Sequence, residues 1–424
     1  MATVVARRSR LNMAVRKEKV WRWEKGLAVP EPPAQYALAD ELGVARHLVD
    51  ACPWPDWLLL VDPEEPTTTA WTTSAAADTI AKVVESAVMD RRGFLIMSGS
   101  AATGLAAAWS AAEPQQVPGL DRGRVTPDMV DHMHARLEQL WHLDDVLGGG
   151  ACLAAGVADL RLVENLIRTG NHPAELGGRL WSLAAAQARF CGWAAFDAGL
   201  QAAAQRFWHA ALRAAAVASD VDQGVYVLSN LALQSAYAGD GATAVGLLEV
   251  ARRRVDPAAR TVLAMLDCWS ARAHALSGDA TTAAVLINQA DDLYDRRRDG
   301  DDPDWVYWMP QPSLTAEAGT ALLAINDLPA AERSLGAGLD TLDADSTRDR
   351  NLYLVRIAET QLRTNRIDEA DATARAAIDA ATGIDSARVQ QRLDALLKQF
   401  PAGDPRTQHL SDYRMAAHQP RMLG

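Results

Sequence analysis

Few residues of this chain stand at spacings that could do chemistry. His132 and His134 are two positions apart, so on a helix they point to different faces and cannot share a metal ion. The run 148–150 of three glycines could contact an anion, but it lacks the Lys and Ser or Thr of a phosphate-binding loop. The motifs of nucleotide-binding folds, serine hydrolases and zinc proteases are also missing. We therefore expect a binding protein and not an enzyme, with no cofactor and no metal.

Charge is distributed unevenly along the 424 residues. The whole chain carries −12, which argues against general coating of nucleic acid, but residues 1–28 hold eight Lys or Arg and two Asp or Glu, a local charge of +6. A small basic module on an acidic body is the simplest interpretation. Four cysteines lie far apart in the sequence, at Cys52, Cys152, Cys191 and Cys268. They are typical of reduced core thiols in a cytoplasmic protein.

A repeat runs through the Ala-rich C-terminal two-thirds of the chain. Its five anchors, spaced 40, 39, 48 and 39 residues apart, are Gly199, Gly239, Gly278, Asn326 and Asn365. The positions seven before, five after and twelve after every anchor are all Gly or Ala. Small residues at fixed points let two antiparallel helices pack closely and let successive pairs stack. The repeat therefore predicts consecutive helix pairs, and an Ala-rich helical bundle is the alternative.

The anchor pattern resembles the tetratricopeptide repeat over residues 152–398, and the turns at 239–240 and 278–279 match its Gly-Asp turn. This resemblance implies a superhelix whose concave wall is lined by the first helix of each pair. Counting along those helices, the residues expected to face inward are Arg189, Trp193, Tyr226, Asn230, Arg272, His274, Glu317, Arg356 and Glu359. Arg can clamp a carboxylate and Asn can bind a peptide backbone, so we expect a peptide or small-molecule effector.

One repeat is longer than the others because it carries an insert over residues 301–308. Trp305, Tyr307 and Trp308 in this insert favour a packing plug over a binding role. Asp144 and Asp145 close an amphipathic helix expected over 129–146, and we interpret them as a cap or a surface feature.

The basic N-terminus resembles the Cro/repressor-like helix-turn-helix family. Residues 20–26 match the end of its recognition region, residues 31–44 match its closing helix, and residues 4–9 would be the preceding helix. The resemblance implies that the side chains facing DNA are Arg16, Lys17, Lys19 and Arg22. A basic helical arm without a DNA role is the alternative.

The chain divides into four parts on these patterns. We expect a head over 1–60, a linker over 61–125 with an apolar helix at 93–112, a solenoid over 126–400 and a poorly ordered tail over 401–424. The apolar run follows Arg91 and Arg92, so it also looks like a twin-arginine export signal and is near the length of a membrane span. Its polar residues and its position favour a buried linker or dimer helix.

The whole arrangement resembles a class of actinobacterial regulators that join a repressor-like head to a tetratricopeptide body. The segments 143–150 and 303–308 strengthen the match. The resemblance implies an all-α fold, with a small helix-turn-helix-like bundle followed by a tetratricopeptide-like α-solenoid. It also implies a cytoplasmic homodimeric transcriptional regulator that binds double-stranded DNA and no membrane. The alternatives are an interaction scaffold with a vestigial head and an exported binding protein, and the sign of regulation stays open.

Overall fold

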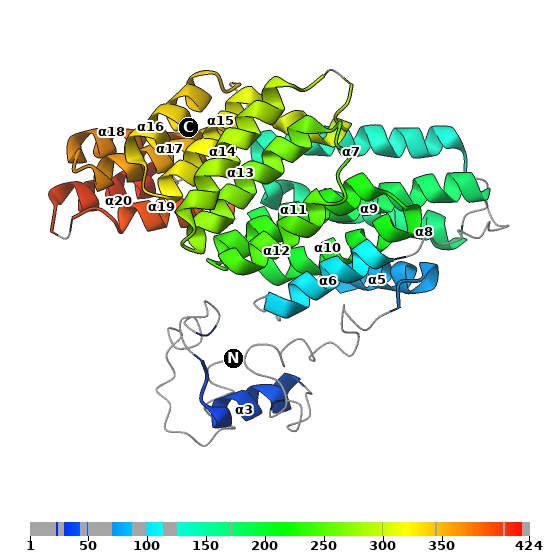
Figure 1. Cartoon of the computed structure of the whole chain (residues 1–424). Helices are drawn as coiled ribbons and strands as arrows, with labels where there is room; N and C mark the ends of the chain where they lie inside the picture. The colour runs from blue at the N-terminus through cyan, green and yellow to red at the C-terminus, as the bar shows by residue number, and fades with distance from the viewer. Residues whose placement is uncertain are drawn as a thin grey trace, which may run out of the picture.

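The computed structural model of the chain describes residues 23, 29–42, 49, 70–86, 99–112, 125–169, 172–298, 300–343, 346–401 and 403–417. All regular secondary structure in these residues is helical, as the Ala-rich composition predicts (Figure 1). The first element, α3 (Pro32–Leu42), coincides with the expected closing helix as far as residue 42. The four DNA-facing candidates, Arg16, Lys17, Lys19 and Arg22, lie outside the described residues, as does the helix expected at 4–9.

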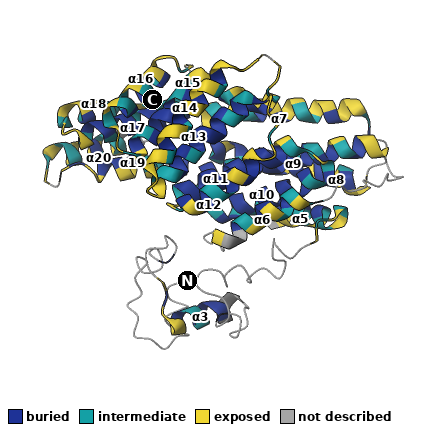
Figure 2. Ribbon diagram, viewed as in Figure 1, coloured by how far each residue is buried: buried dark blue, intermediate teal, exposed yellow. Residues whose placement is uncertain are grey.

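Five helix pairs follow one another along the body. They are α9 (Ala174–Asp197) with α10 (Gln201–Ala218), α11 (Val221–Tyr237) with α12 (Gly241–Arg252), α13 (Arg260–Leu276) with α14 (Ala280–Asp295), α15 (Gln311–Ala324) with α16 (Leu328–Asp340), and α17 (Thr347–Arg363) with α18 (Ile367–Ala380). The two helices of each pair pack on each other, and each pair also contacts the next. Figure 2 shows that buried residues gather on the faces where these helices meet.

The anchors of the repeat form the turns inside these pairs. All five have a positive φ, namely Gly199 at 80°, Gly239 and Gly278 at 85°, Asn326 at 64° and Asn365 at 61°. In every turn the N–H of the residue after the anchor donates to the carbonyl five residues before it. This is the Schellman closure of a helix, which needs a left-handed residue and therefore favours Gly or Asn. The occurrence of Gly or Asn at the anchors thus has a backbone cause.

The small residues that flank the anchors are all buried where helices cross. Gly192 on α9 is the clearest case, because a Cβ atom there would stand 2.3 Å from the ring of Trp208 on α10. The five alanines that follow the anchors, at positions 204, 244, 283, 331 and 370, have no exposed surface. Larger side chains at these points would push the paired helices apart.

Three further helices connect the two ends of the row of helix pairs. The helices α7 (Pro127–Leu147) and α8 (Gly149–Thr169) precede the first pair and pack on α9, whereas α19 (Ala387–Leu397) follows the last pair and packs on both α17 and α9. The backbone of Asp385, just before α19, accepts from the N–H of Gly150 at 3.0 Å and donates to the carbonyl of Leu147 at 2.8 Å. The last helices of the array therefore contact the first ones.

The segment interpreted as a linker contributes two helices that lie on the outer side of the body. α5 (Thr73–Ser86) packs on α8 and α10, and α6 (Gly99–Ala111) packs on α10 and α12 (Figure 1). The apolar helix was expected over 93–112, and residues 93–98 lie outside the described part of the chain. No helix in the described part has the length and apolar character needed to cross a bilayer.

The C-terminal tail differs from the expectation of poor order. α20 (Pro405–Ala417) packs on α18 and α19, and its Leu410 is fully buried. Tyr413 donates a hydrogen bond to Asp379 at 2.7 Å, and Arg414 pairs with Asp394. For residues 403–417 the prediction was wrong, because it weighed the low apolar content of the segment and not the few side chains that anchor it, and residues 418–424 lie outside the described part of the chain.

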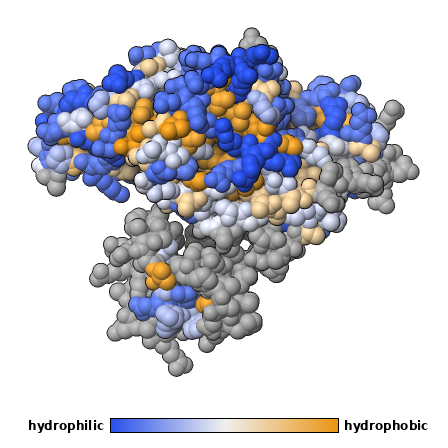
Figure 3. Space-filling view, in the orientation of Figure 1, coloured by the Kyte–Doolittle hydropathy of each residue, from blue (hydrophilic) through white to orange (hydrophobic). Residues whose placement is uncertain are grey.

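Apolar side chains remain visible on the surface of the body. On the face drawn in Figure 3, hydrophobic residues gather near the middle, with hydrophilic residues above them and at both ends. Leu276 and Val285, on α13 and α14, are 43% and 50% exposed. Partly exposed residues of this kind are ordinary on a helical surface.

Candidate functional site

The first helices of the five pairs surround a cavity inside the body. Lining residues come from α9, α11, α13, α15 and α17, together with α7, α19 and the short 3-10 helix η2 (Asp304–Trp308), and the second helices of the pairs contribute none. The space open to the centres of water molecules is about 90 Å³, and one water needs roughly 10–15 Å³ on this measure. The cavity is therefore sized for several waters or a small molecule.

Seven of the nine residues expected to face inward line this cavity, and they are Arg189, Trp193, Tyr226, Asn230, Arg272, Glu317 and Arg356. We call the cavity-facing residues of the five first helices the inner wall. The expectation was wrong for two others. His274 lies 3.5 Å from Asp279 at a turn, because two residues of helix turn it away from the face of Arg272. Glu359 pairs instead with Arg363 at 2.8 Å.

The cavity is also lined by residues that the counting missed. Tyr237 comes eleven residues after Tyr226 and therefore lies on the same face of α11. Arg348 precedes Arg356 by eight residues on α17, which again keeps the face. Helical periodicity alone could have found both. Arg388 belongs to α19, outside the five repeats, so the repeat gave no signal for it.

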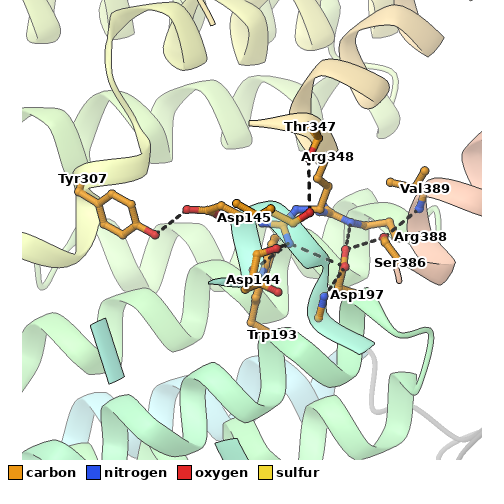
Figure 4. A network of polar contacts seen from close by, with 12 residues as sticks. Asp144, Asp145, Trp193, Asp197, Tyr307, Thr347, Arg348, Ser386, Arg388 and Val389 are labelled. Atoms are coloured by element: carbon orange, nitrogen blue, oxygen red, sulfur yellow. Dashed lines mark hydrogen bonds and ion pairs between the residues drawn. The ribbon is translucent and has the colours of Figure 1, made fainter. Parts of the chain in front are cut away.

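Five charged residues form what we call the closing junction, namely Asp144, Asp145, Asp197, Arg348 and Arg388. It joins the first helices of the body to the last ones (Figure 4). Arg348 lies 2.8 Å from Asp144, 3.3 Å from Asp145 and 3.8 Å from Asp197, and Arg388 lies 3.0 Å from Asp197. Asp144 is thus not a surface feature, because it is buried and carries an ion pair, whereas Asp145 is a third exposed.

Hydrogen bonds complete the junction around its carboxylates. Asp197 accepts from Ser386 at 2.9 Å and from the N–H of Gly149 at 3.0 Å, and Asp144 accepts from the indole of Trp193 at 2.8 Å. Burial opposes the ionisation of Asp197, but Arg348 and Arg388 outweigh it and lower its pKa. At Asp144 burial outweighs Arg348 and the pKa is raised. Each guanidinium of this junction therefore faces at least one carboxylate.

Aromatic residues of the insert close one side of the cavity. Trp305 stacks on Tyr226 with ring centres 4.0 Å apart, and Trp308 lies 5.9 Å from Trp269. Tyr307 donates a hydrogen bond to Asp145 at 3.0 Å, as Figure 4 shows. The insert thus packs across the inner wall, as its aromatic composition predicts, and its rings also line the cavity.

Two arginines of the inner wall lack the carboxylate partners that Arg348 and Arg388 have. Arg189 and Arg272 are 3% and 8% exposed, and among the described residues neither forms an ion pair. Arg189 lies over the ring of Tyr226 at 4.0 Å, and Arg272 lies over Tyr237 at 4.7 Å. Nε of Arg189 and Nη1 of Arg272 have no hydrogen-bond partner within the described protein. Burial lowers the pKa of both side chains.

Nearby polar groups share this lack of partners. Both amide atoms of Asn230, which is 1% exposed, are without a hydrogen bond inside the described part of the protein, as are Nε and Nη1 of Arg356. Burial of an unpaired polar group costs on the order of 1–3 kcal/mol, and a charge costs more. Several buried polar side chains without hydrogen-bond partners around one cavity are typical of a site that binds a polar ligand.

The charges at one end of the cavity act on Tyr237. Burial opposes ionisation of its phenol, but the charges of Arg388, Arg356 and Arg272 outweigh burial and lower the pKa to about 7. At the other end burial raises the pKa of Asp145 to about 6 despite Arg348. The end of the cavity near Tyr237 is thus strongly electropositive and favours an anion.

The described thiols do not add a reactive group to this site. Cys152, Cys191 and Cys268 are free and buried, and burial raises the pKa of all three, that of Cys152 to about 11. Among the described residues, no group of three His, Cys, Asp or Glu side chains could hold a metal ion.

No protein-family model matches the sequence, and no curated protein resembles it closely enough to count as a relative.

Proposed function

We propose that the chain is a DNA-binding transcriptional regulator whose helical-repeat domain senses a small-molecule ligand. The observation that carries this proposal is the cavity, where buried arginine and asparagine side chains on the inner wall lack partners. The helix-turn-helix resemblance of the basic N-terminus supplies the DNA-binding half. The regulator is proposed to act as a cytoplasmic homodimer, since two-fold DNA sites favour paired heads.

The five helix pairs support the further proposal of a tetratricopeptide-like α-solenoid. Their Gly or Asn turns, buried small residues and inward-facing first helices are what that resemblance implies. The closing junction sets this array apart from an open superhelix, because it ties the last helices to the first. A cavity of this size suits a small molecule better than an extended peptide.

Helix α11 offers a route from the cavity to the head. It presents Tyr226 and Asn230 to the cavity, whereas Gly224 on its other side accommodates Trp109 of α6. A Cβ atom at Gly224 would stand 1.8 Å from that indole, so Trp109 lies directly against the backbone of α11. α6 belongs to the segment that connects the head to the array. A ligand that shifts α11 would therefore displace α6 and change how the two heads are spaced.

The direct test is DNA binding by the purified full chain. DNA from the region upstream of its own coding sequence is compared with scrambled DNA at roughly 50 and 200 mM salt. We expect sequence-selective binding that weakens at the higher salt and that Arg16→Ala and Arg22→Ala reduce by about tenfold. Glu18→Ala, in the same segment, serves as the matched control and should not weaken binding. Equal affinity for scrambled DNA would contradict the proposal and favour an interaction scaffold.

A further inference from the structure

Helix α11 runs along the cavity from one end to the other. Tyr226, Asn230 and Tyr237 lie on one face of this helix and all contact the cavity. Eleven residues of helix separate the two tyrosines, which is roughly 16 Å at the usual rise. The cavity therefore has two ends of different chemistry, with the unpartnered amide of Asn230 between them.

The end beside Tyr237 has an excess of positive charge. Arg272, Arg356 and Arg388 face it from α13, α17 and α19, and Arg392 adds to their effect. Arg388 is engaged by Asp197 at 3.0 Å, while Glu317 stands 3.7 Å from Arg356. No carboxylate of the described residues pairs with Arg272. Arg272 thus has no carboxylate within ion-pair distance among the described residues, and Arg356 has only Glu317 at 3.7 Å.

The end beside Tyr226 is built from flat rings. Trp141, Trp305 and Trp308 line it, with Arg189 lying over Tyr226 and 5.4 Å from Trp141. The indole N–H groups of Trp141 and Trp305 have no hydrogen-bond partner in the described protein. Rings of this kind hold planar groups by stacking and add donors at their edges.

We propose that the cavity binds a small organic anion that carries a planar ring, with its anionic group on Arg272 and Arg356 and its ring toward the tryptophans. The proposal rests on the ligand-sensing role proposed above and names the class of ligand. A carboxylate and a phosphate monoester share the required chemistry, since both accept two parallel N–H donors from a guanidinium. A cation is excluded by the charges of the arginines, and a neutral ring would leave Arg272 without a paired carboxylate or phosphate.

Calorimetric titration of the full chain without DNA tests this class of ligand. The probes are benzoate, indole-3-acetate and phenyl phosphate, with benzamide and indole-3-acetamide as neutral matches and tryptamine as the cationic match. We expect at least one anion to bind, and its neutral match to bind at least about tenfold more weakly. The carboxylate and phosphate arms show which anionic group is preferred. Absence of binding by all three anions up to roughly 5 mM, or equal binding of a neutral match or tryptamine, would overturn the proposal.

Two variants locate the bound anion. Arg272→Met should lower the affinity of the best anion by about tenfold or more and leave that of its neutral match unchanged. Arg189→Met is a second test in case the first variant folds poorly, and it should weaken the anion and its neutral match together because Arg189 lies among the rings. Arg253→Met, at an exposed end of α12, is the control. Full affinity in the folded Arg272→Met chain would refute the placement.

The phenol of Tyr237 gives an independent spectroscopic signal. An anion seated on Arg272 and Arg356 offsets the charges that lower its pKa, so the phenolate absorbance that titrates near neutral pH should move to higher pH. Tyr237→Phe should remove the signal, and a neutral match should not shift it. Binding without this shift would place the anion elsewhere.

The two proposals can fail separately. If the chain binds the anion but does not select DNA, the ligand proposal stands and the regulator proposal is rejected. If it selects DNA but binds none of the anions, the regulator proposal stands and the ligand proposal is rejected.

Discussion

Two sets of buried arginines in this molecule differ in their partners and not in their burial. In the closing junction, Arg348 faces three aspartates and Arg388 faces one. On the inner wall, Arg189 and Arg272 are about as buried, yet neither forms an ion pair among the described residues. A buried charge without a partner lowers stability, whereas a compensated one fixes an arrangement of helices. The comparison separates residues that close the array from residues that we propose to bind a ligand.

The largest expected effect is loss of the paired arginine. Arg348→Met leaves Asp144 and Asp197 buried with less positive charge, so the free energy of unfolding should fall by about 3–5 kcal/mol. Urea unfolding followed by circular dichroism measures the change. The control Arg253→Met, whose partner Glu249 is exposed, should change it by less than about 0.5 kcal/mol. A small loss at Arg348 would remove the distinction between the two sets.

Next in size is a pH effect from the inner wall. The pKa of Tyr237 is about 7 in the folded chain and about 10 in an unfolded one. The folded state therefore binds fewer protons between these values, so stability should rise from pH 7 to 10, by about 2–4 kcal/mol, and be lost as pH falls through 7. Urea unfolding at a series of pH values should show this slope, and Tyr237→Phe should remove it. An unchanged slope in the variant would rule out a phenolate among the arginines.

Asp145 of the closing junction should give a pH effect of opposite sign. The pKa of Asp145 is about 6 in the folded chain and about 3.9 in an unfolded one. The folded state binds more protons in that interval, so this group should make the chain less stable as pH rises from 4 to 6. Asp145 is a third exposed, and after allowance for solvent the effect is about 1 kcal/mol. Asp145→Asn should flatten this part of the profile, and a steeper profile would contradict the assignment.

The smallest effect is expected at a residue that sequence counting placed wrongly. His274 lies outside the cavity beside Asp279, so His274→Ala should change unfolding by less than about 0.5 kcal/mol and ligand affinity by less than about twofold. Titration of the best anion into this variant is the measurement. A clear loss of affinity would mean that the inner wall extends beyond the cavity.

Local rules of the sequence predicted the helix pairs and most of the inner wall. The five anchors adopt left-handed backbone, and the period of a helix brought Arg189, Tyr226 and Arg272 to one cavity. These features are set by residues close together in the sequence, so they can be recognised from a repeat pattern. The ligand roles of the inner-wall residues remain predictions.

The closure of the array could not be read from the repeat. It depends on two residues that follow the last pair. Asp385 meets Leu147 at the end of α7, more than two hundred residues earlier, and Arg388 meets Asp197 at the end of α9. Nothing local marks Asp144 as the partner of Arg348, and a pair of acids at a helix end is usually exposed. The docking of α20 was missed because only a few side chains anchor it, among them the buried Leu410 and Tyr413, which donates to Asp379.

The central claim is that Arg272 is kept for a ligand at a cost to stability. The measurement that tests it most directly is the free energy of unfolding of Arg272→Met without ligand, beside the unchanged chain. Met fills a similar volume without the buried charge, so the account predicts equal stability or a gain of about 1 kcal/mol. A loss of about 3 kcal/mol, as expected for Arg348→Met, would show that Arg272 is a structural residue and would contradict the account.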